Sequence, residues 1–255
     1  MGAFDSLTTT DSNFMITTTD SNFMIALLGG FALFWGTSVL GIPRASQRLL
    51  AFLALHGGMV RRAAVAGTLW PDASESHASS SLRSVLTRLQ GTARRALAIR
   101  NLELGLAEGV TVDLRRAHQL AQRLLDPAVT PGRSEVSIGA VPVLSAELLP
   151  DWYDDWVLIE AEDWRRLRLH ALEALAGRLI ALGRWGEAAG AAGAAVRAEP
   201  LRESARAALI QVHLAEGNQS EAVREYARYR ALLRGELGLE PTLRLRQLVQ
   251  GLRGS

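Results

Sequence analysis

One predicted helix of this 255-residue chain alternates small hydroxyl side chains with arginines along one face. Hydrophobic residues recur every three or four positions from Leu82 to Leu97, which predicts an amphipathic helix with one buried stripe. A rotation of about 100° per residue places these residues opposite the stripe or on its flank: Ser80, Arg83, Ser84, Thr87, Arg88, Gly91, Arg94 and Arg95. Serine and threonine can bind DNA phosphates, and arginine can bind phosphates or guanine edges. The pattern favours a DNA ligand, although an ordinary solvated helix face would show it too.

The charges are segregated along the chain, although the formal net charge is only +2. Residues 1–24 contain three aspartates and no arginine. Residues 25–110 contain nine arginines and four acidic residues, and residues 111–255 contain nineteen of each. Positive charge concentrated on one compact region is what binding to a phosphate backbone requires. The charge distribution therefore supports double-stranded DNA as the partner of the region around the predicted helix.

The composition argues against several kinds of enzyme. The chain has no cysteine, which excludes disulfides, cysteine-bound zinc and thiol nucleophiles. All 28 basic residues are arginines, whereas a Walker-A loop, a protein kinase and a pyridoxal Schiff base each need a lysine. The five histidines are scattered without metal-ligand spacing. We therefore expect a protein that is not an enzyme and that uses neither a metal nor a cofactor.

One segment combines carboxylates with aromatic rings. It comprises Asp151, Trp152, Tyr153, Asp154, Asp155 and Trp156, and continues with Glu160, Glu162, Asp163 and Trp164. Paired carboxylates beside tryptophans could form a glycosidase-like acid and base pair. The alternative is a helix N-terminus, where aspartates interact favourably with the helix dipole and the aromatic rings pack into a core. We favour this structural interpretation, because nothing else in the chain builds a catalytic site around the segment.

Three predicted helices and a hairpin would position the hydroxyl and arginine face. The first helix starts near Ser46 and ends at Gly57, and the second runs from about Arg62 to Trp70, where Pro71 ends it. A polar loop leads to the third helix. Beyond it, two short β-prone pieces around Glu108 and Gly109 read as a hairpin wing.

The nearly continuous apolar run from Phe23 to Ile42 allows two interpretations. Its length would suffice for a membrane anchor. However, glycines divide it into short β-prone pieces at Ile25–Leu28, Phe31–Trp35 and Ser38–Ile42, so we favour a small sheet. Ahead of it the nonapeptide TTTDSNFMI occurs twice, at Thr8–Ile16 and at the nine residues that end in Ile25, and we expect a flexible extension over residues 1–25.

The second half of the chain is dominated by helical patterns with an internal repeat. A long helix is predicted from about Asp155 to Leu182. The segment Gly183-Arg-Trp-Gly-Glu-Ala recurs 34 positions later as Gly217-Asn-Gln-Ser-Glu-Ala. This is the tetratricopeptide (TPR) period, with glycine in the turn between two helices and a small alanine packed below it.

Several segments, in their order along the chain, resemble one family of bacterial regulators. LLGGFAL, SQRLLAFLALHGG, RRAAVAGTLWPD and SSLRSVLTRLQ resemble the DNA-binding domain of the SARP-type (antibiotic regulatory protein) transcriptional activators. ELLPDWYDDWVLIEAE, LHALEALA, AVRAEPLRESA and YRALLRGELGLEP resemble the bacterial transcriptional activator domain of the same family. The resemblance extends from about Ala26 to the C-terminus. It implies a regulator that binds promoter repeats, as a homodimer in many members, and recruits RNA polymerase.

The resemblance also implies roles for individual residues. The helix around Ser80–Gln90 would enter the major groove. The loop before it, which consists of Asp72, Ala73, Ser74, Glu75 and Ser76, would face RNA polymerase. We further expect Ser46 and Gln47 at the start of the first helix to contact phosphate. The chain departs from the family pattern at Ala32–Trp35, at Gln90 and at Leu104–Leu106, and the last two departures weaken any DNA contact carried over to Gln90 or the wing.

Together these observations predict a mainly α protein with a winged helix-turn-helix and small β-sheets, followed by an all-α, TPR-like domain. We expect an extension at residues 1–25, the winged helix at 26–112 and the helical domain at 113–255. The predicted function is a sequence-specific transcriptional activator in the cytoplasm, associated with the nucleoid. The alternatives are a TPR-type scaffold whose winged helix does not bind DNA, and a regulator anchored in the membrane by residues 23–42.

Overall fold

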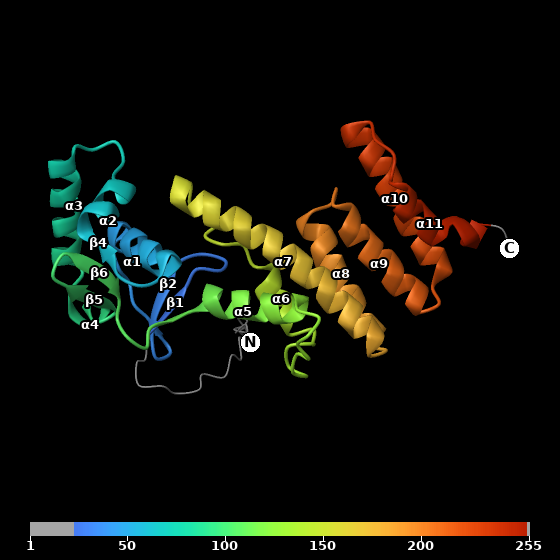
Figure 1. Ribbon diagram of the computed structural model, residues 1–255, viewed down its shortest axis with the longest axis horizontal. Coiled ribbons are helices and arrows are strands. Elements are labelled where there is room, and N and C mark those ends of the chain that lie inside the picture. Colours follow the sequence, from blue (N-terminus) through green and yellow to red (C-terminus); the bar gives the residue numbers. More distant parts are fainter. Residues whose placement is uncertain (1–22, 254–255) are drawn as a thin grey trace, which may run out of the picture.

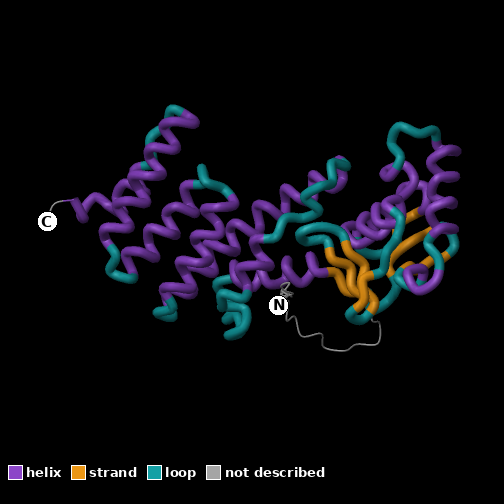
Figure 2. Tube along the Cα trace, turned by 180° about the vertical axis from the view of Figure 1, so that it is seen from behind, coloured by secondary structure: helices purple, strands orange, loops and turns teal. Residues whose placement is uncertain are grey.

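The computed structural model describes residues 23–253 of the chain. Figure 2 shows that the strands gather at one end of an elongated molecule, whereas the other end consists of helices. The long helix α7 (Asp155–Ala181) runs between the two ends (Figure 1). This arrangement agrees with the predicted fold class.

The apolar run forms a small sheet. Its strands are β1 (Phe23–Ala26), β2 (Ala32–Trp35), β3 (Ser38–Val39) and, from later in the chain, β7 (Thr111–Val112), in the order β3-β2-β1-β7. Strand β1 pairs antiparallel with β2, with Ile25 opposite Leu33, and parallel with β7. The membrane-anchor alternative is therefore wrong for residues 23–42, because they form strands and turns. None of the helices within residues 23–253 is long and apolar enough to cross a bilayer.

Strand β1 begins two residues earlier than predicted. Phe23 and Ile25 both point into the core, and alternate residues of a strand face the same side, so the ladder with β2 extends back to Phe23. The last three residues of the repeated nonapeptide therefore belong to the sheet. The first copy of the nonapeptide and the rest of the expected extension lie outside the described residues.

Four helices, the last of them only four residues long, and a three-stranded wing complete the winged helix. These elements are α1 (Arg44–His56), β4 (Val60–Arg61), α2 (Arg62–Leu69), α3 (Glu75–Arg88), α4 (Gly91–Arg94), β5 (Leu97–Arg100) and β6 (Glu103–Leu106). The wing has the strand order β4-β6-β5. Helix α3 packs against α1 and α2 and lies at the outer edge of the molecule (Figure 1).

The expectation that the third helix continues to Leu97 is wrong. Helix α3 ends at Arg88, Leu89 and Gln90 are extended, and Gly91, the first residue of the short α4, has φ +61°. Glycine tolerates this left-handed conformation, so the chain can turn there. Leu89 and Leu97 are nevertheless buried as the pattern predicted, which shows that the periodic stripe marked the core rather than one continuous helix.

The remaining helices form antiparallel layers. They are α5 (Asp113–Leu125), α6 (Ala140–Ser145), α7, α8 (Trp185–Ala198), α9 (Glu203–Ala215), α10 (Gln219–Leu237) and α11 (Leu243–Gln250). Gly183 and Gly217 adopt φ +69° and +86° in the turns α7–α8 and α9–α10, and the alanines five positions later are fully buried. The predicted helical repeat is thus confirmed.

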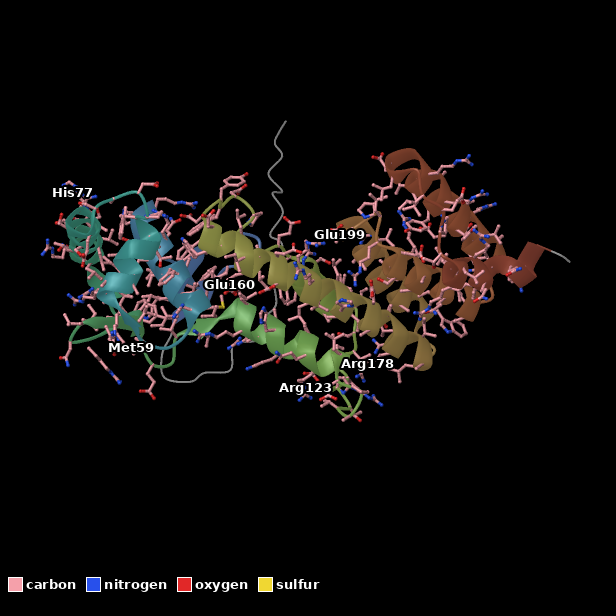
Figure 3. The ribbon with its side chains drawn as sticks, turned by 45° about the horizontal axis from the view of Figure 1, so that its top comes forward. Met59, His77, Arg123, Glu160, Arg178 and Glu199 are labelled. Carbon is pink, nitrogen blue, oxygen red and sulfur yellow. The ribbon has the colours of Figure 1, made fainter. Side chains whose placement is uncertain are left out.

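Arginines fix the long connection between α5 and α6. Arg178 of α7 donates hydrogen bonds to the carbonyl oxygens of Leu124 and Asp126 at 2.9 and 2.8 Å, and Arg123 pairs with Glu135 at 2.8 Å. Figure 3 shows Arg123 and Arg178 at the same end of the helical layer. Side-chain donors thereby satisfy the carbonyl groups that a helix C-terminus leaves without a partner.

The buried residues form two cores. The larger one is continuous from β1 through the winged helix into α5, α7, α8 and α9. The smaller core lies among α9, α10 and α11 and consists of Ile210, Ala222, Tyr226, Tyr229, Leu233, Leu245 and Val249. The domain boundary between Val112 and Asp113 stays a prediction, because the larger core continues across it.

Asp113 joins the first sheet to the helical layers. Its carboxylate accepts hydrogen bonds from the backbone N–H groups of Leu27 at 2.9 Å and Leu28 at 3.1 Å. In addition, the Gly29 N–H donates to the carbonyl oxygen of Glu147 at 2.7 Å. These bonds link the β1–β2 turn to α5 and to the segment that leads into α7.

The ionisation of Asp113 should be visible in the pH dependence of stability. Burial raises its pKa above the usual 3.8, against the opposing effect of the backbone N–H donors. Because the folded state then binds the proton more tightly than the unfolded chain, this group stabilises the fold fully below pH 3.8, and the effect disappears as pH rises through the folded pKa. We expect the Asp113→Asn variant to lose stability more steeply than the native chain as pH falls from 7 toward 3.8. Urea midpoints measured across this range test the prediction, and parallel curves would contradict it.

The acidic and aromatic segment connects the winged helix to α7. The Trp152 ring stacks on Phe31 with centroids 6.1 Å apart, and the Arg44 guanidinium lies 3.9 Å above the Trp152 ring. Asp154 precedes α7 and pairs with Arg48 of α1 at 2.5 Å. These contacts agree with the structural interpretation of the segment, because a carboxylate and a tryptophan here hold two elements together.

Candidate nucleic-acid interface

Helix α3 is anchored by one face and exposed on the other. Ser74 caps its N-terminus by accepting a hydrogen bond from the His77 N–H at 3.4 Å. Ala78, Leu82 and Val85 are buried against the rest of the winged helix. The opposite face is exposed, and its shallow, open surface is lined by Ser80, Arg83, Ser84, Thr87 and Arg88. Figure 3 shows His77 at the outer edge of the molecule, so the helix presents this face without obstruction from the helical half.

The hydroxyl groups on this face lie close to the helix backbone. Ser84 Oγ donates to the carbonyl oxygen of Ser80 at 3.1 Å, and Thr87 Oγ1 donates to that of Arg83 at 2.9 Å. Ser80 Oγ instead accepts a hydrogen bond from Arg83 Nη2 at 2.8 Å. Short side chains held in this way allow a duplex to approach closely, with the arginines as the longest groups on the face.

Most arginines of the winged helix lack carboxylate partners, and Arg48, which pairs with Asp154, is the exception. Within residues 23–253, no ion pair involves any of Arg61, Arg62, Arg83, Arg88, Arg94, Arg95 and Arg100. In the helical half, by contrast, most arginines are paired, for example Arg184 with Glu187 and Arg202 with Glu173, both at 2.7 Å. The positive charge at the strand-containing end is therefore not neutralised within the described chain, as electrostatic attraction of a polyanion requires.

Apart from Asp154, the carboxylates of the helical half that form ion pairs bind arginines or a histidine of the same half. Hydrogen bonds from Arg165 and Arg166 lower the pKa of Glu162 to about 2. A hydrogen bond from Arg184 likewise lowers the pKa of Glu187. No group of three or more acidic or histidine side chains within residues 23–253 is arranged to hold a metal ion.

The expected phosphate contact from Ser46 is wrong. Helix α1 begins at Arg44, which places Ser46 one turn before Leu49 and Leu50 on the inner face of the helix, and Ser46 is only 1% exposed. The neighbouring Gln47 is half-buried, and its Nε2 donates to the carbonyl oxygen of Ile42 at 3.0 Å. Neither side chain joins the exposed face of α3.

Arg94 and Arg95 also lie off that face, because the chain turns at Gly91. Arg95 is exposed beyond α4. Arg94 is half-buried, and its Nη1 atom is buried without a hydrogen-bond partner in the described part of the chain. Gln90 Nε2 donates to the carbonyl oxygen of Thr87 at 3.0 Å and so covers the end of α3. The structure thus brings together five of the predicted DNA-binding residues, all of them on α3.

The loop from Asp72 to Ser76 forms the entrance to α3. Its first two residues end a turn that begins at Trp70, in which the Ala73 N–H donates to the Trp70 carbonyl oxygen at 3.2 Å. Ser74 is the N-cap of α3, and the last two residues belong to α3. All its residues except the half-buried Ala73 are exposed. The loop is accessible to a protein partner, and its contact with RNA polymerase stays a prediction.

The wing adds exposed residues that the sequence patterns did not predict. Asn101 adopts φ +49° in the β5–β6 turn, and the adjacent Leu102 is 74% exposed. Arg100 beside the turn and Arg61 on β4 are exposed as well. The expected hairpin turn at Glu108 and Gly109 is wrong, because β5 pairs with β6 around Asn101, whereas β7 pairs with β1 in the first sheet. Asparagine is one of the few residues that tolerate the left-handed region, so Asn101 was a usable signal for the turn.

Comparisons with known proteins agree with this geometry. The family model described as "Bacterial transcriptional activator domain" matches residues 112–253. The regulatory protein AfsR of Streptomyces coelicolor is 28% identical over 225 residues, which cover 84% of this chain but only 22% of AfsR. The chain therefore spans about a fifth of the length of that relative.

A solved structure supports the fold across both halves. Mycobacterium tuberculosis EmbR, determined in complex with a low-affinity phosphopeptide, superposes with a TM-score of 0.68 at 22% identity. The match covers 91% of this chain and 65% of EmbR, so it extends through the winged helix as well as the helical repeats. The family match covers more than half of the 255 residues and confirms the resemblance found in the sequence, and the chain belongs to the bacterial transcriptional activator domain family of SARP-type regulators.

Proposed function

We propose that this protein is a sequence-specific DNA-binding activator that inserts α3 into the major groove and recruits RNA polymerase through the loop Asp72–Ser76. The observation that carries the proposal is the exposed face of α3, where Arg83 and Arg88 accompany three hydroxyl side chains without a carboxylate partner in the described chain. Such a face offers phosphate contacts for affinity and base-edge contacts for specificity. Membership of a transcriptional regulator family supports the same function.

A second candidate is a protein-interaction scaffold whose winged helix does not bind DNA. The side chain of Gln90 favours this scaffold function. Its amide nitrogen donates a hydrogen bond to the Thr87 carbonyl oxygen at the end of α3, so the side chain does not extend from the helix. In that case the helical repeats would carry the function, and the arginines would only keep the winged helix solvated.

DNA selection and a salt titration distinguish the two functions. Selection from a random duplex library would define a preferred site. Fluorescence anisotropy would then compare a duplex containing that site with a scrambled duplex of equal composition between 50 and 200 mM salt. We expect salt-sensitive binding to both duplexes and tighter binding to the preferred one. Stimulation of run-off transcription by RNA polymerase would test recruitment. No enrichment in the selection, or equal weak binding to both duplexes, would favour the scaffold.

The Arg88→Ala variant should bind both duplexes more weakly by a similar factor. Arg88 is exposed in the last turn of α3, and its side chain has neither a hydrogen bond nor an ion pair within residues 23–253, so its charge is free to contact phosphate. Loss of one phosphate contact should lower the slope of log affinity against log salt by about one. The matched control is Arg224→Ala, which removes another exposed arginine, paired with Glu221 at the opposite end of the molecule. Equal slopes for the two variants would remove Arg88 from the interface.

A further inference from the structure

We propose that Arg83 is the base-reading residue of α3 and that Ser80 is the residue that positions it. The inference rests on the proposed function and assigns distinct tasks to the two arginines of this face. Arg83 Nη2 donates to Ser80 Oγ at 2.8 Å, and both residues are exposed. Among the three hydroxyl groups on the face, that of Ser80 is hydrogen-bonded to a side chain, that of Arg83. The hydroxyl groups of Ser84 and Thr87 donate to backbone carbonyl oxygens instead.

The hydrogen bond directs Arg83 toward the part of α3 that reads bases in related motifs. Helical side chains lean toward the N-terminus, and Ser80 lies one turn N-terminal to Arg83, so the guanidinium lies back along the helix. In helix-turn-helix complexes the N-terminal residues of the recognition helix contact the base edges. Arg88 lies in the last turn of α3, closer to where the duplex backbone would pass.

The geometry leaves Arg83 chemically competent for guanine. A guanidinium has several N–H donors and no acceptor, so one bond to Ser80 leaves the other donors for the O6 and N7 atoms of a guanine. No carboxylate in the described chain competes for the group, because Arg83 makes no ion pair there. Ser80 therefore restricts the guanidinium without neutralising it.

This restriction should contribute to specificity more than to general affinity. An arginine already held in one orientation loses less rotamer freedom when it binds a base in a fixed geometry. A phosphate contact requires a less precise orientation of the guanidinium than a base contact, since phosphate oxygens are present at every position of a duplex. The side chain of Arg88 has no partner to hold it within residues 23–253, so it is suited to contact a DNA phosphate. The chemistry that Arg83 would recognise is the major-groove edge of a G·C pair.

The test measures the ratio of affinities for the preferred and scrambled duplexes. Arg83→Ala should lower this ratio by roughly 5- to 150-fold. Ser80→Ala should lower it by roughly two- to tenfold, the size expected for ordering one long side chain, with nearly unchanged affinity for the scrambled duplex. Ser80→Thr should restore much of the ratio because it keeps the hydroxyl. Ser220→Ala is the matched control, since this exposed serine lies on α10, at the end of the molecule opposite α3. Alanine favours the helix at both positions, so folding is not at risk.

A double variant isolates the coupling between the two residues. In the Arg83→Ala background, Ser80→Ala should cause no further loss of the ratio, because no guanidinium remains to be positioned. If the native chain shows no preference for any duplex, the proposed function itself fails. If the native chain discriminates but Ser80→Ala behaves like Ser220→Ala, or still lowers the ratio in the Arg83→Ala background, the positioning role is overturned.

Discussion

Replacement of Trp164 by alanine is expected to lower the free energy of unfolding by about 3–5 kcal/mol. Trp164 is fully buried on α7 and is the largest of the completely buried side chains among the described residues. Its ring stacks on His118 of α5 with centroids 5.2 Å apart, and its Nε1 donates to the Ala146 carbonyl oxygen at 2.9 Å. The truncation would therefore leave a large cavity between two helices and an unpaired buried carbonyl group.

The position of Trp164 makes this loss more than a local defect. Ala146 begins the short segment that reaches back to the first sheet, where Leu148 forms a bridge with Leu28. Loosening this segment should weaken the joint between the winged helix and the helical layers. Urea denaturation at pH 7 measures the stability. Trp164→Phe is the control, because it keeps a stacked ring and removes the N–H group, and it should cost less.

His118 provides an independent readout of the same variant. Burial lowers the pKa of His118 below the usual 6.5, against the opposing charges of Glu160 and Asp163. Water entering the cavity should remove much of this desolvation, so the pKa should rise in Trp164→Ala when it is followed by NMR. A loss of stability below about 1 kcal/mol together with an unchanged His118 pKa would contradict the packing derived for Trp164.

Local sequence patterns predicted the parts of the fold that depend on local physics. Apolar spacing and helix-ending residues located α1, α2 and α7, because a helix that packs on one face must repeat every three or four residues. The recurrence at Gly183 and Gly217 located two turns of the helical repeat, because both require a left-handed residue. The exposed face of α3 was predicted for the same reason, since the buried stripe determines which side faces solvent.

The sequence-based predictions were wrong where tertiary packing determines the structure. The stripe from Leu82 to Leu97 continues in helical spacing across Gly91, and only the packing of the wing shows that three elements supply it. Ser46 is a polar residue in the first turn of a helix, which favours exposure, yet the rotation of α1 against its neighbours buries it. Most arginines of the winged helix form no ion pair within the described residues, whereas most of those in the helical half do. This difference depends on three-dimensional distances between side chains, which no sequence pattern encodes directly.

The second-largest effect is expected at Glu225 of α10, in the smaller core. Its side chain is only 5% exposed and forms an ion pair with Arg206 of α9, which is 11% exposed. Arg228 approaches the same carboxylate at 3.1 Å. The Glu225→Gln variant preserves the volume but leaves the buried Arg206 without its counter-charge, and removal of one partner from a buried pair typically costs about 3–5 kcal/mol.

The loss of stability in the Glu225→Gln variant should be confined to α9, α10 and α11. The smaller core contains seven buried residues and lies at the end of the molecule opposite α3 (Figure 1), so it can open without exposing the winged helix. We expect faster amide hydrogen exchange in α10 and α11 of Glu225→Gln, and unchanged exchange in α1 and α3. Glu221→Gln, on the same helix with an exposed arginine partner, is the control and should cost at most about 1 kcal/mol. Faster exchange throughout the chain would show instead that both cores unfold as one unit, and DNA affinity should then fall together with the stability of the smaller core.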